Sequence, residues 1–143
     1  MTPDIRPVVF SEAAFAPILA EAEHAGGAFM LRVREEWVSG VHCFDGPGEF
    51  LLGAFLDGEL VGVGGVSRDP YDPRPGLGRI RHIYVSQRLR GTGVGRALIA
   101  AIVERARAHW QVLRLRTKEA GAFYERLGFR RHDGPNETHR LDL

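Results

Sequence analysis

The spacing of apolar residues along the first third of the chain predicts a short edge strand followed by two helices. Apolar residues recur every three or four positions over Glu12–His24 and again over 28–38, which is the period of an amphipathic helix. Ser11 precedes the first helix as a typical N-cap residue. The strand covers 5–10, where Pro7 lacks a backbone donor and therefore favours the edge of a sheet.

The middle of the chain is rich in β-forming residues and predicts three strands. Phe50–Leu56 and 59–66 are separated by Asp57-Gly58, a pair that favours a two-residue hairpin turn because glycine tolerates a positive φ. A loop rich in proline and glycine occupies 67–78, and a further strand covers 80–85.

Helices and strands alternate in the last third of the chain. A glycine-rich turn at 91–95 opens a helix that runs to about His109, and the strand Val112–Leu115 follows. A short helix covers 118–127, with Gly128 just after its last turn. Two closing strands are expected at 129–131 and 138–143. This order of elements predicts an α/β (α+β) domain, with helices packed on the faces of a mixed sheet.

Composition fits one globular domain and suggests an anionic ligand. The chain has 143 residues, of which 44% are hydrophobic, so we expect a single domain over residues 1–143. The net charge of +1 conceals a division, because residues 1–67 carry three arginines and ten acids, whereas residues 68–143 carry sixteen basic residues and eight acids. All but one of the basic residues are arginine, which is well suited to phosphate contacts. An uneven solvated surface would explain the asymmetry equally well.

A single cysteine, Cys43, rules out an internal disulfide bond and a cysteine-rich zinc site. Its neighbour His42 is not expected to activate the thiol, because adjacent side chains seldom face each other, and a buried, inert cysteine is the better interpretation. The six histidines show no metal-binding spacing. The first residues lack the order of a secretory signal, and no early apolar run is long enough to span a bilayer. We therefore expect a cytoplasmic protein with no membrane partner.

The glycine-rich turn after the strand at 80–85 is suited to binding phosphate. A helix N-terminus presents unpaired N–H groups and about half a positive charge, and glycine lets the backbone approach a ligand closely. A P-loop requires Gly-Lys-Ser/Thr, and the chain contains no Gly-Lys. A dinucleotide-binding fold requires G-x-G-x-x-G and an acid about 20 residues later, and the sequence provides neither.

Two segments of the basic half resemble the signatures of one enzyme family. The segment 84–98, YVSQRLRGTGVGRAL, resembles the acetyl-CoA motif Arg/Gln-x-x-Gly-x-Gly/Ala of the GNAT superfamily of N-acetyltransferases, and it matches the motif twice in overlap. The segment 123–129, FYERLGF, resembles the second signature of that family, on the helix after its fifth strand. The resemblance covers residues 50–131 well. It implies a mostly antiparallel central sheet flanked by helices, in a GNAT-like acyl-CoA N-acyltransferase fold.

The resemblance also implies roles for individual residues, with acetyl-CoA as co-substrate and no metal. The turn at 90–96 would hold the pyrophosphate through backbone N–H groups, and the end of the preceding strand would hold the pantetheine arm and the acetyl carbonyl. The expected cofactor-binding residues are Ile83, Tyr84, Val85, Arg88, Arg90, Gly91, Thr92, Gly93, Val94, Gly95 and Arg96. Tyr124 would stand near the thioester sulfur and donate a proton to the leaving thiolate.

The general base is the point at which this chain departs from the family pattern. Members often carry an acid near the start of the fourth strand, where this chain reads RIRH at 79–82. His82 is the expected base, since an ordinary imidazole titrates near pH 6.5. The alternatives are a relayed water molecule and the carboxylates Glu36, Glu49 and Asp72. The arginines of this segment, Arg81 among them, also suggest an acceptor that bears a carboxylate or phosphate.

The expected function is transfer of an acetyl group from acetyl-CoA to a primary amine of a small molecule or peptide, by direct attack through a tetrahedral intermediate. Two other classes of protein remain open. One is a non-catalytic module of the same fold that binds or senses acyl-CoA. The other is an arginine-rich nucleic-acid-binding domain, in which Arg114 and Arg116 would form a basic stripe, although RNA-binding aromatic motifs are absent. A homodimer is compatible with this type of fold, but no residue pattern supports one.

Overall fold

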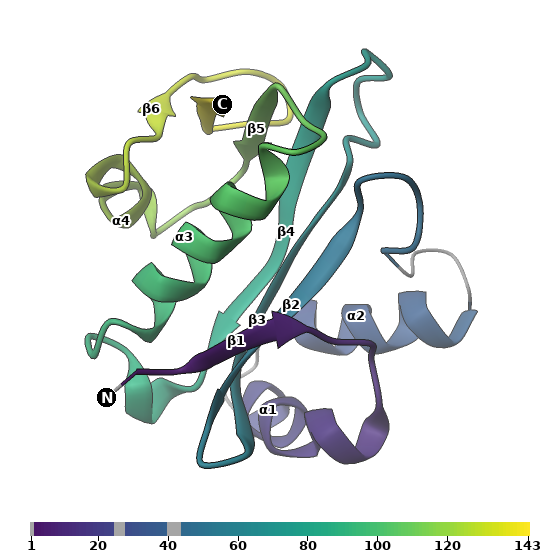
Figure 1. Ribbon diagram of the computed structural model, residues 1–143, viewed down its shortest axis with the longest axis vertical. Coiled ribbons are helices and arrows are strands. Elements are labelled where there is room, and N and C mark those ends of the chain that lie inside the picture. The colour runs from purple at the N-terminus through teal and green to yellow at the C-terminus, as the bar shows by residue number, and fades with distance from the viewer. Residues whose placement is uncertain (1, 25–27, 40–43) are drawn as a thin grey trace.

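A sheet of seven strands forms the centre of the protein within residues 2–24, 28–39 and 44–143, which the computed structural model describes (Figure 1). The strands are β1 (Asp4–Pro7), β2 (Phe50–Leu56), β3 (Glu59–Arg68), β4 (Leu77–Val85), β5 (Val112–Leu115), β6 (Arg130–Arg131) and β7 (His139–Asp142). They lie in the order β1-β2-β3-β4-β5-β7-β6. β4 and β5 pair in parallel, and the other neighbours pair antiparallel. The predicted mixed, mostly antiparallel sheet is confirmed.

Helices cover both faces of this sheet (Figure 1). They are α1 (Glu12–His24), α2 (Ala28–Ser39), α3 (Val94–Ala106) and α4 (Gly121–Arg126), with a 3₁₀ turn at Gln87–Leu89. Neighbouring residues of a strand point to opposite faces, so β2 contributes to two cores. Leu51 packs with Phe15 of α1, whereas Phe50 and Leu52 pack with Leu98 of α3. No helix in the described ranges combines the length and apolar character needed to cross a membrane.

Several helices and strands begin or end at other residues than predicted, because tertiary contacts lengthen or shorten them relative to the local sequence pattern. The loop predicted over 67–78 is shorter, since β3 and β4 continue pairing as far as Arg68 and Gly78. Helix α3 ends at Ala106 rather than near residue 109. Helix α4 begins at residue 121 rather than 118, because the Thr117 hydroxyl accepts a hydrogen bond from Ala120 N at 3.0 Å and forms a turn ahead of it.

Strand β4 contains a bulge that the sequence pattern did not predict. Two of its residues, His82 and Ile83, lie opposite the single residue Gly64 of β3. His82 has a φ of +60°, in the left-handed region that non-glycine residues rarely adopt. A Cβ atom at Gly64 would overlap the side chain of Ile83, so glycine provides the space for the bulge. β4 pairs with β5 over 77–79 and the two strands separate beyond that point.

A buried ion network joins the residue after β3, strand β5 and the segment before β7. Arg114 donates hydrogen bonds to both carboxylate oxygens of Asp69 and, at 3.0 Å, to Glu137. All three residues are at least 94% buried. Burial raises the pKa of Asp69, but its hydrogen bonds from Arg114 and Tyr71 and the charges of nearby arginines outweigh that effect and lower it. Because Arg114 lies in the interior, the surface stripe expected of a nucleic-acid-binding domain does not form.

Candidate active site

A cavity of about 1250 Å³ lies between the second half of β4, the glycine-rich turn before α3, and α4. His82 lines it from the bulge, and Tyr124 lines it from α4. All the expected cofactor-binding residues line it except Arg88, Thr92 and Val94. The structure therefore brings the two expected catalytic residues and most of the expected cofactor residues to one cavity.

The glycine-rich turn has the geometry of a phosphate site. Gly91 and Gly93 have φ values of +79° and +98°, which other residues rarely adopt. The first hydrogen bond of α3 runs from Ala97 N to Gly93 O at 3.0 Å, so the N–H groups of the turn before Ala97 have no acceptor within the helix. These groups and the helix dipole suit the phosphates of coenzyme A.

Three of the expected cofactor residues do not line the cavity, and their side chains have other partners. Arg88 forms an ion pair with Glu59 at 2.9 Å. The Thr92 hydroxyl donates a hydrogen bond to the carbonyl oxygen of Leu89. Val94 is buried in an apolar cluster with Leu89. Contact of these three residues with the cofactor stays a prediction.

The cavity is strongly basic. The cationic side chains that line it are Arg32, Arg90, Arg96, Arg116, Lys118 and Arg126, and the acidic residue among its lining is Glu119. Arg90 is also held by a hydrogen bond from its Nε to the carbonyl oxygen of Val85 at 3.1 Å. The division of charge along the sequence predicted an anionic ligand for the basic half. It did not indicate that Arg32, from the acidic half, would line the same cavity. A polyanion such as coenzyme A fits this donor set.

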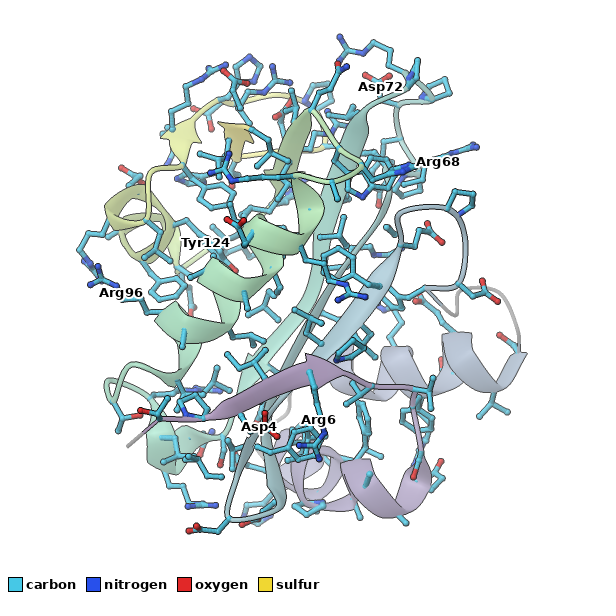
Figure 2. All side chains as sticks on the ribbon, viewed as in Figure 1. Asp4, Arg6, Arg68, Asp72, Arg96 and Tyr124 are labelled. Atoms are coloured by element: carbon cyan, nitrogen blue, oxygen red, sulfur yellow. The ribbon has the colours of Figure 1, made fainter. Side chains whose placement is uncertain are left out.

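Tyr124 is held in an aromatic cluster on the α3 side of the sheet. Its ring centroid lies 5.1 Å from that of Phe123 and 5.5 Å from that of Phe129, both in edge-to-face geometry. Tyr124 lies between α4 and α3, with Arg96 at the same edge of the molecule (Figure 2). Burial raises the pKa of its phenol to about 12, so the hydroxyl keeps its proton at neutral pH.

His82 reaches the cavity from the opposite side and contacts Glu36 of α2. The His82 Nε2 atom lies 3.2 Å from Glu36 Oε2, and the His82 side chain is 7% exposed. The Glu36 Oε1 atom lies 3.5 Å from Arg81 Nη2. The ring of Phe44 packs edge-on against the imidazole at a centroid distance of 5.8 Å. Glu36 thus joins the two consecutive residues of β4 at the start of the bulge.

The other proposed bases lie elsewhere. The Glu49 carboxylate accepts hydrogen bonds from Gly46 N and Arg68 N at 3.0 and 2.8 Å, and it does not line the cavity. Asp72 pairs with Arg74 at 2.7 Å, far from Tyr124 (Figure 2). The pair formed by residues 42 and 43, the single cysteine included, lies outside the described residues.

Glu21 of α1 is a site residue that sequence reasoning missed. Its carboxylate accepts hydrogen bonds from the Tyr84 hydroxyl at 2.8 Å, the Ser86 hydroxyl at 2.8 Å and Gln87 N at 2.5 Å. Burial raises the pKa of Glu21, but these three hydrogen bonds and the Arg90 charge outweigh that effect and lower it. The partners are more than 60 residues away in sequence, so no local pattern signals the contact.

Comparisons with known proteins agree with this geometry. The sequence pattern of the acetyltransferase (GNAT) family matches residues 13–129. A glucosamine 6-phosphate N-acetyltransferase from Trypanosoma brucei brucei is 34% identical over 90 residues, which cover 60% of this chain and 59% of that protein. The match therefore spans less than two thirds of the relative's length.

Solved structures share the fold. The structure of a protein described as an acetyltransferase from Exiguobacterium sp. 255-15 superposes with a TM-score of 0.88 at 29% identity, covering 99% of this chain and 94% of that one. A GNAT family acetyltransferase from Elizabethkingia anophelis with acetyl-CoA bound has a TM-score of 0.55 at 19% identity, covering 68% of this chain and 78% of that one. The family uses acetyl-CoA as acetyl donor, and the predicted fold and family are confirmed. The chain belongs to the acetyltransferase (GNAT) family.

Proposed function

We propose that the protein transfers the acetyl group of acetyl-CoA to the primary amine of a small molecule or peptide. The observation that carries this proposal is that a single cavity is lined by the glycine-rich turn, by His82 and by Tyr124. When bound, acetyl-CoA supplies the acetyl thioester. Its phosphates would be held by the N–H groups at the start of α3 and by Arg90 and Arg96.

His82 is the proposed general base. Its imidazole would accept a proton from the acceptor ammonium, which leaves a neutral amine able to attack the thioester carbonyl. Glu36, 3.2 Å from the imidazole, acts as a positioning residue. A carboxylate in this position orients the ring and stabilises the imidazolium that forms.

The remaining steps use the β4 main chain and Tyr124. Beyond residue 79, β4 no longer pairs with β5 and lines the cavity, so a strand N–H would stabilise the developing oxyanion. The Tyr124 hydroxyl, with its pKa raised to about 12 by burial, stays protonated and would donate to the departing thiolate. The proton that the acceptor nitrogen loses as the amide forms restores the phenol.

Release of free thiol from acetyl-CoA, measured with a panel of amines, tests the proposal. The panel includes glucosamine 6-phosphate, because the name of one relative gives that substrate. We expect amine-dependent thiol release, an acetylated product by mass spectrometry, and kcat about 100-fold lower in His82→Gln and in Tyr124→Phe. Tyr71→Phe, in the exposed loop before β4, is the matched control and should keep full activity.

One outcome would favour a different class of protein. If the protein bound acetyl-CoA tightly and released no thiol with any amine, a non-catalytic acyl-CoA sensor would be the better description. Equal activity of the wild type and Tyr124→Phe would remove the tyrosine from the mechanism while leaving acetyl transfer itself in place.

A further inference from the structure

Arg32 of α2 lies close to the reacting end of the cavity. It lines the same cavity as His82 and Tyr124. It precedes Glu36 by four residues, so the two side chains share one face of the helix, with Cβ atoms about 6 Å apart. Because Glu36 contacts His82, Arg32 lies about one helical turn along α2 from the residue that touches the proposed base.

The guanidinium of Arg32 carries an unneutralised charge. Within the part of the chain that the structure describes, no carboxylate lies within ion-pair distance of it, and the side chain is exposed. Two of the neighbouring charges on α2 are paired, since Arg34 lies 3.8 Å from Glu12 and Glu36 lies 3.5 Å from Arg81. Arg81, which the sequence suggested as an anion-binding residue, is therefore committed to Glu36.

The cofactor phosphates belong to the other side of the sheet. The glycine-rich turn and Arg96 lead into α3, which packs on the face that also carries α4. Arg32 and His82 enter the cavity from the α2 face, where Glu36 joins α2 to β4. Because it enters on the same side as the proposed base, Arg32 is placed to contact the acceptor.

We infer that the acceptor amine carries an anionic group, a phosphate or a carboxylate, and that Arg32 binds this group. The inference rests on the proposed function and narrows its substrate class. An amine held at His82 with its anion at Arg32 must be a small molecule or chain terminus in which a few bonds separate the two charges. Guanidinium–phosphate and guanidinium–carboxylate contacts are charge-assisted and often bidentate, so they select for such a ligand.

Matched acceptors test the inference. Ethanolamine, phosphoethanolamine and β-alanine present a similar amine with no anion, a phosphate or a carboxylate, and glucosamine with its 6-phosphate forms a second pair. We expect kcat/KM for the favoured anionic amine to exceed that of the neutral one by about tenfold or more. The phosphate and carboxylate arms identify which anion the site prefers. Equal values for neutral and anionic amines would overturn the inference.

Substitutions in α2 test whether Arg32 causes the preference for anionic acceptors. Arg32→Ala should lower kcat/KM for phosphoethanolamine about tenfold, mainly through the acceptor KM, and erase its advantage over ethanolamine, while Arg32→Lys should retain part of it. Arg34→Ala, which removes a half-buried arginine paired with Glu12, is the matched control and should keep the wild-type preference. A rise in the acetyl-CoA KM of Arg32→Ala with no change in acceptor preference would place Arg32 at the cofactor and overturn the inference.

A binding measurement separates this inference from the proposed function. If no amine is acetylated, the proposed function fails, and binding of phosphoethanolamine to the coenzyme A-saturated protein is then followed by NMR. Binding that Arg32→Ala abolishes and Arg34→Ala preserves would support the anion site without catalysis. No binding, or equal binding by the wild type and Arg32→Ala, would overturn it.

Discussion

The Tyr84 hydroxyl donates a hydrogen bond of 2.8 Å to Glu21, and this contact joins α1 to the end of β4. The same carboxylate accepts hydrogen bonds from Ser86 and from the backbone of Gln87, at the start of the turn that leads to the phosphate site. The guanidinium of Arg90 lies 5.4 Å from the centroid of the Tyr84 ring. Helix α1 thus helps to hold the cofactor turn, although it lies on the other face of the sheet.

Removing this carboxylate should weaken cofactor binding. Glu21→Ala leaves three donors without their acceptor, so the turn loses an anchor and the KM for acetyl-CoA is expected to rise about tenfold, with a smaller change in kcat. Steady-state kinetics with varied acetyl-CoA measures the effect. Glu23→Ala, an exposed acid on the same helix, should behave as the wild type. An unchanged acetyl-CoA KM in Glu21→Ala would show that the turn is ordered without α1.

Tyr124 should not limit the rate in alkaline solution. Burial raises the pKa of its phenol from an ordinary value near 10 to about 12, so the proton-donating form persists throughout the range in which a free tyrosine would ionise. We expect kcat, corrected for uncatalysed thioester hydrolysis, to show no decline due to this group up to pH 10. A decline centred near pH 10 that vanishes in Tyr124→Phe would contradict the assignment.

The buried ion network predicts a large loss of stability on removal of one charge. Asp69→Asn leaves Arg114 with one carboxylate fewer in the interior and should lower the free energy of unfolding by about 3–5 kcal/mol. Urea denaturation measures the change. Asp133→Asn, which breaks an exposed pair with Arg131, is the control and should cost less than about 1 kcal/mol. A similar loss in both variants would mean that the network contributes no more than a surface pair.

The same carboxylate predicts the direction of acid sensitivity. The folded state lowers the pKa of Asp69 below its ordinary value of 3.8, so the stabilisation is complete above that value and is lost as the pH falls through the folded pKa. Urea titrations between pH 6 and pH 3 should show a drop at the acid end that is smaller in Asp69→Asn. Identical pH dependence of the two proteins would exclude Asp69 as its source.

The close approach of Gly64 and Ile83 predicts that one substitution lowers stability and that a second one partly restores it. A Cβ atom at this position would overlap the terminal carbon of Ile83, so Gly64→Ala should lower stability by about 1–3 kcal/mol. Ile83→Val removes that carbon, and the double variant should be more stable than the sum of the single effects. Gly62→Ala is the control, because its Cβ would make ordinary contacts of 3.4–3.6 Å. Additive effects of the two changes would argue against the predicted overlap.

The sequence predicted those features that depend on neighbouring residues. The hairpin at Asp57-Gly58 is confirmed, with φ values of +51° and +80° that suit the expected turn. The glycine-rich turn and the tyrosine signature were also recognisable, because each is a continuous segment whose residue types follow from its backbone geometry. Their placement at one cavity follows from the fold that those signatures implied.

Contacts between distant segments were beyond that kind of reasoning. Nothing near Glu21 or Arg32 marks them as parts of the cofactor and acceptor sides, since their partners come from β4 and from a cavity formed by several elements. The alternation of side chains along β5 made Arg114 a candidate for nucleic-acid contact. Such a pattern does not show which face of the strand other elements cover. The left-handed conformation of His82 is imposed by pairing with β3, and residue type did not signal it.

The bulge in β4 also determines which side chains of this strand face the cavity and which face α1. A strand turns every side chain to the opposite face when its register shifts by one residue. Without the extra residue opposite Gly64, Ile83 and Tyr84 would exchange faces relative to the strand before them. Tyr84 would then lose Glu21, and the apolar chain of Ile83 would leave the cavity. The number of residues in β4 therefore determines which side chains meet at the site, and a one-residue deletion there would take Tyr84 out of the core beneath α1 and Ile83 out of the core beneath α3.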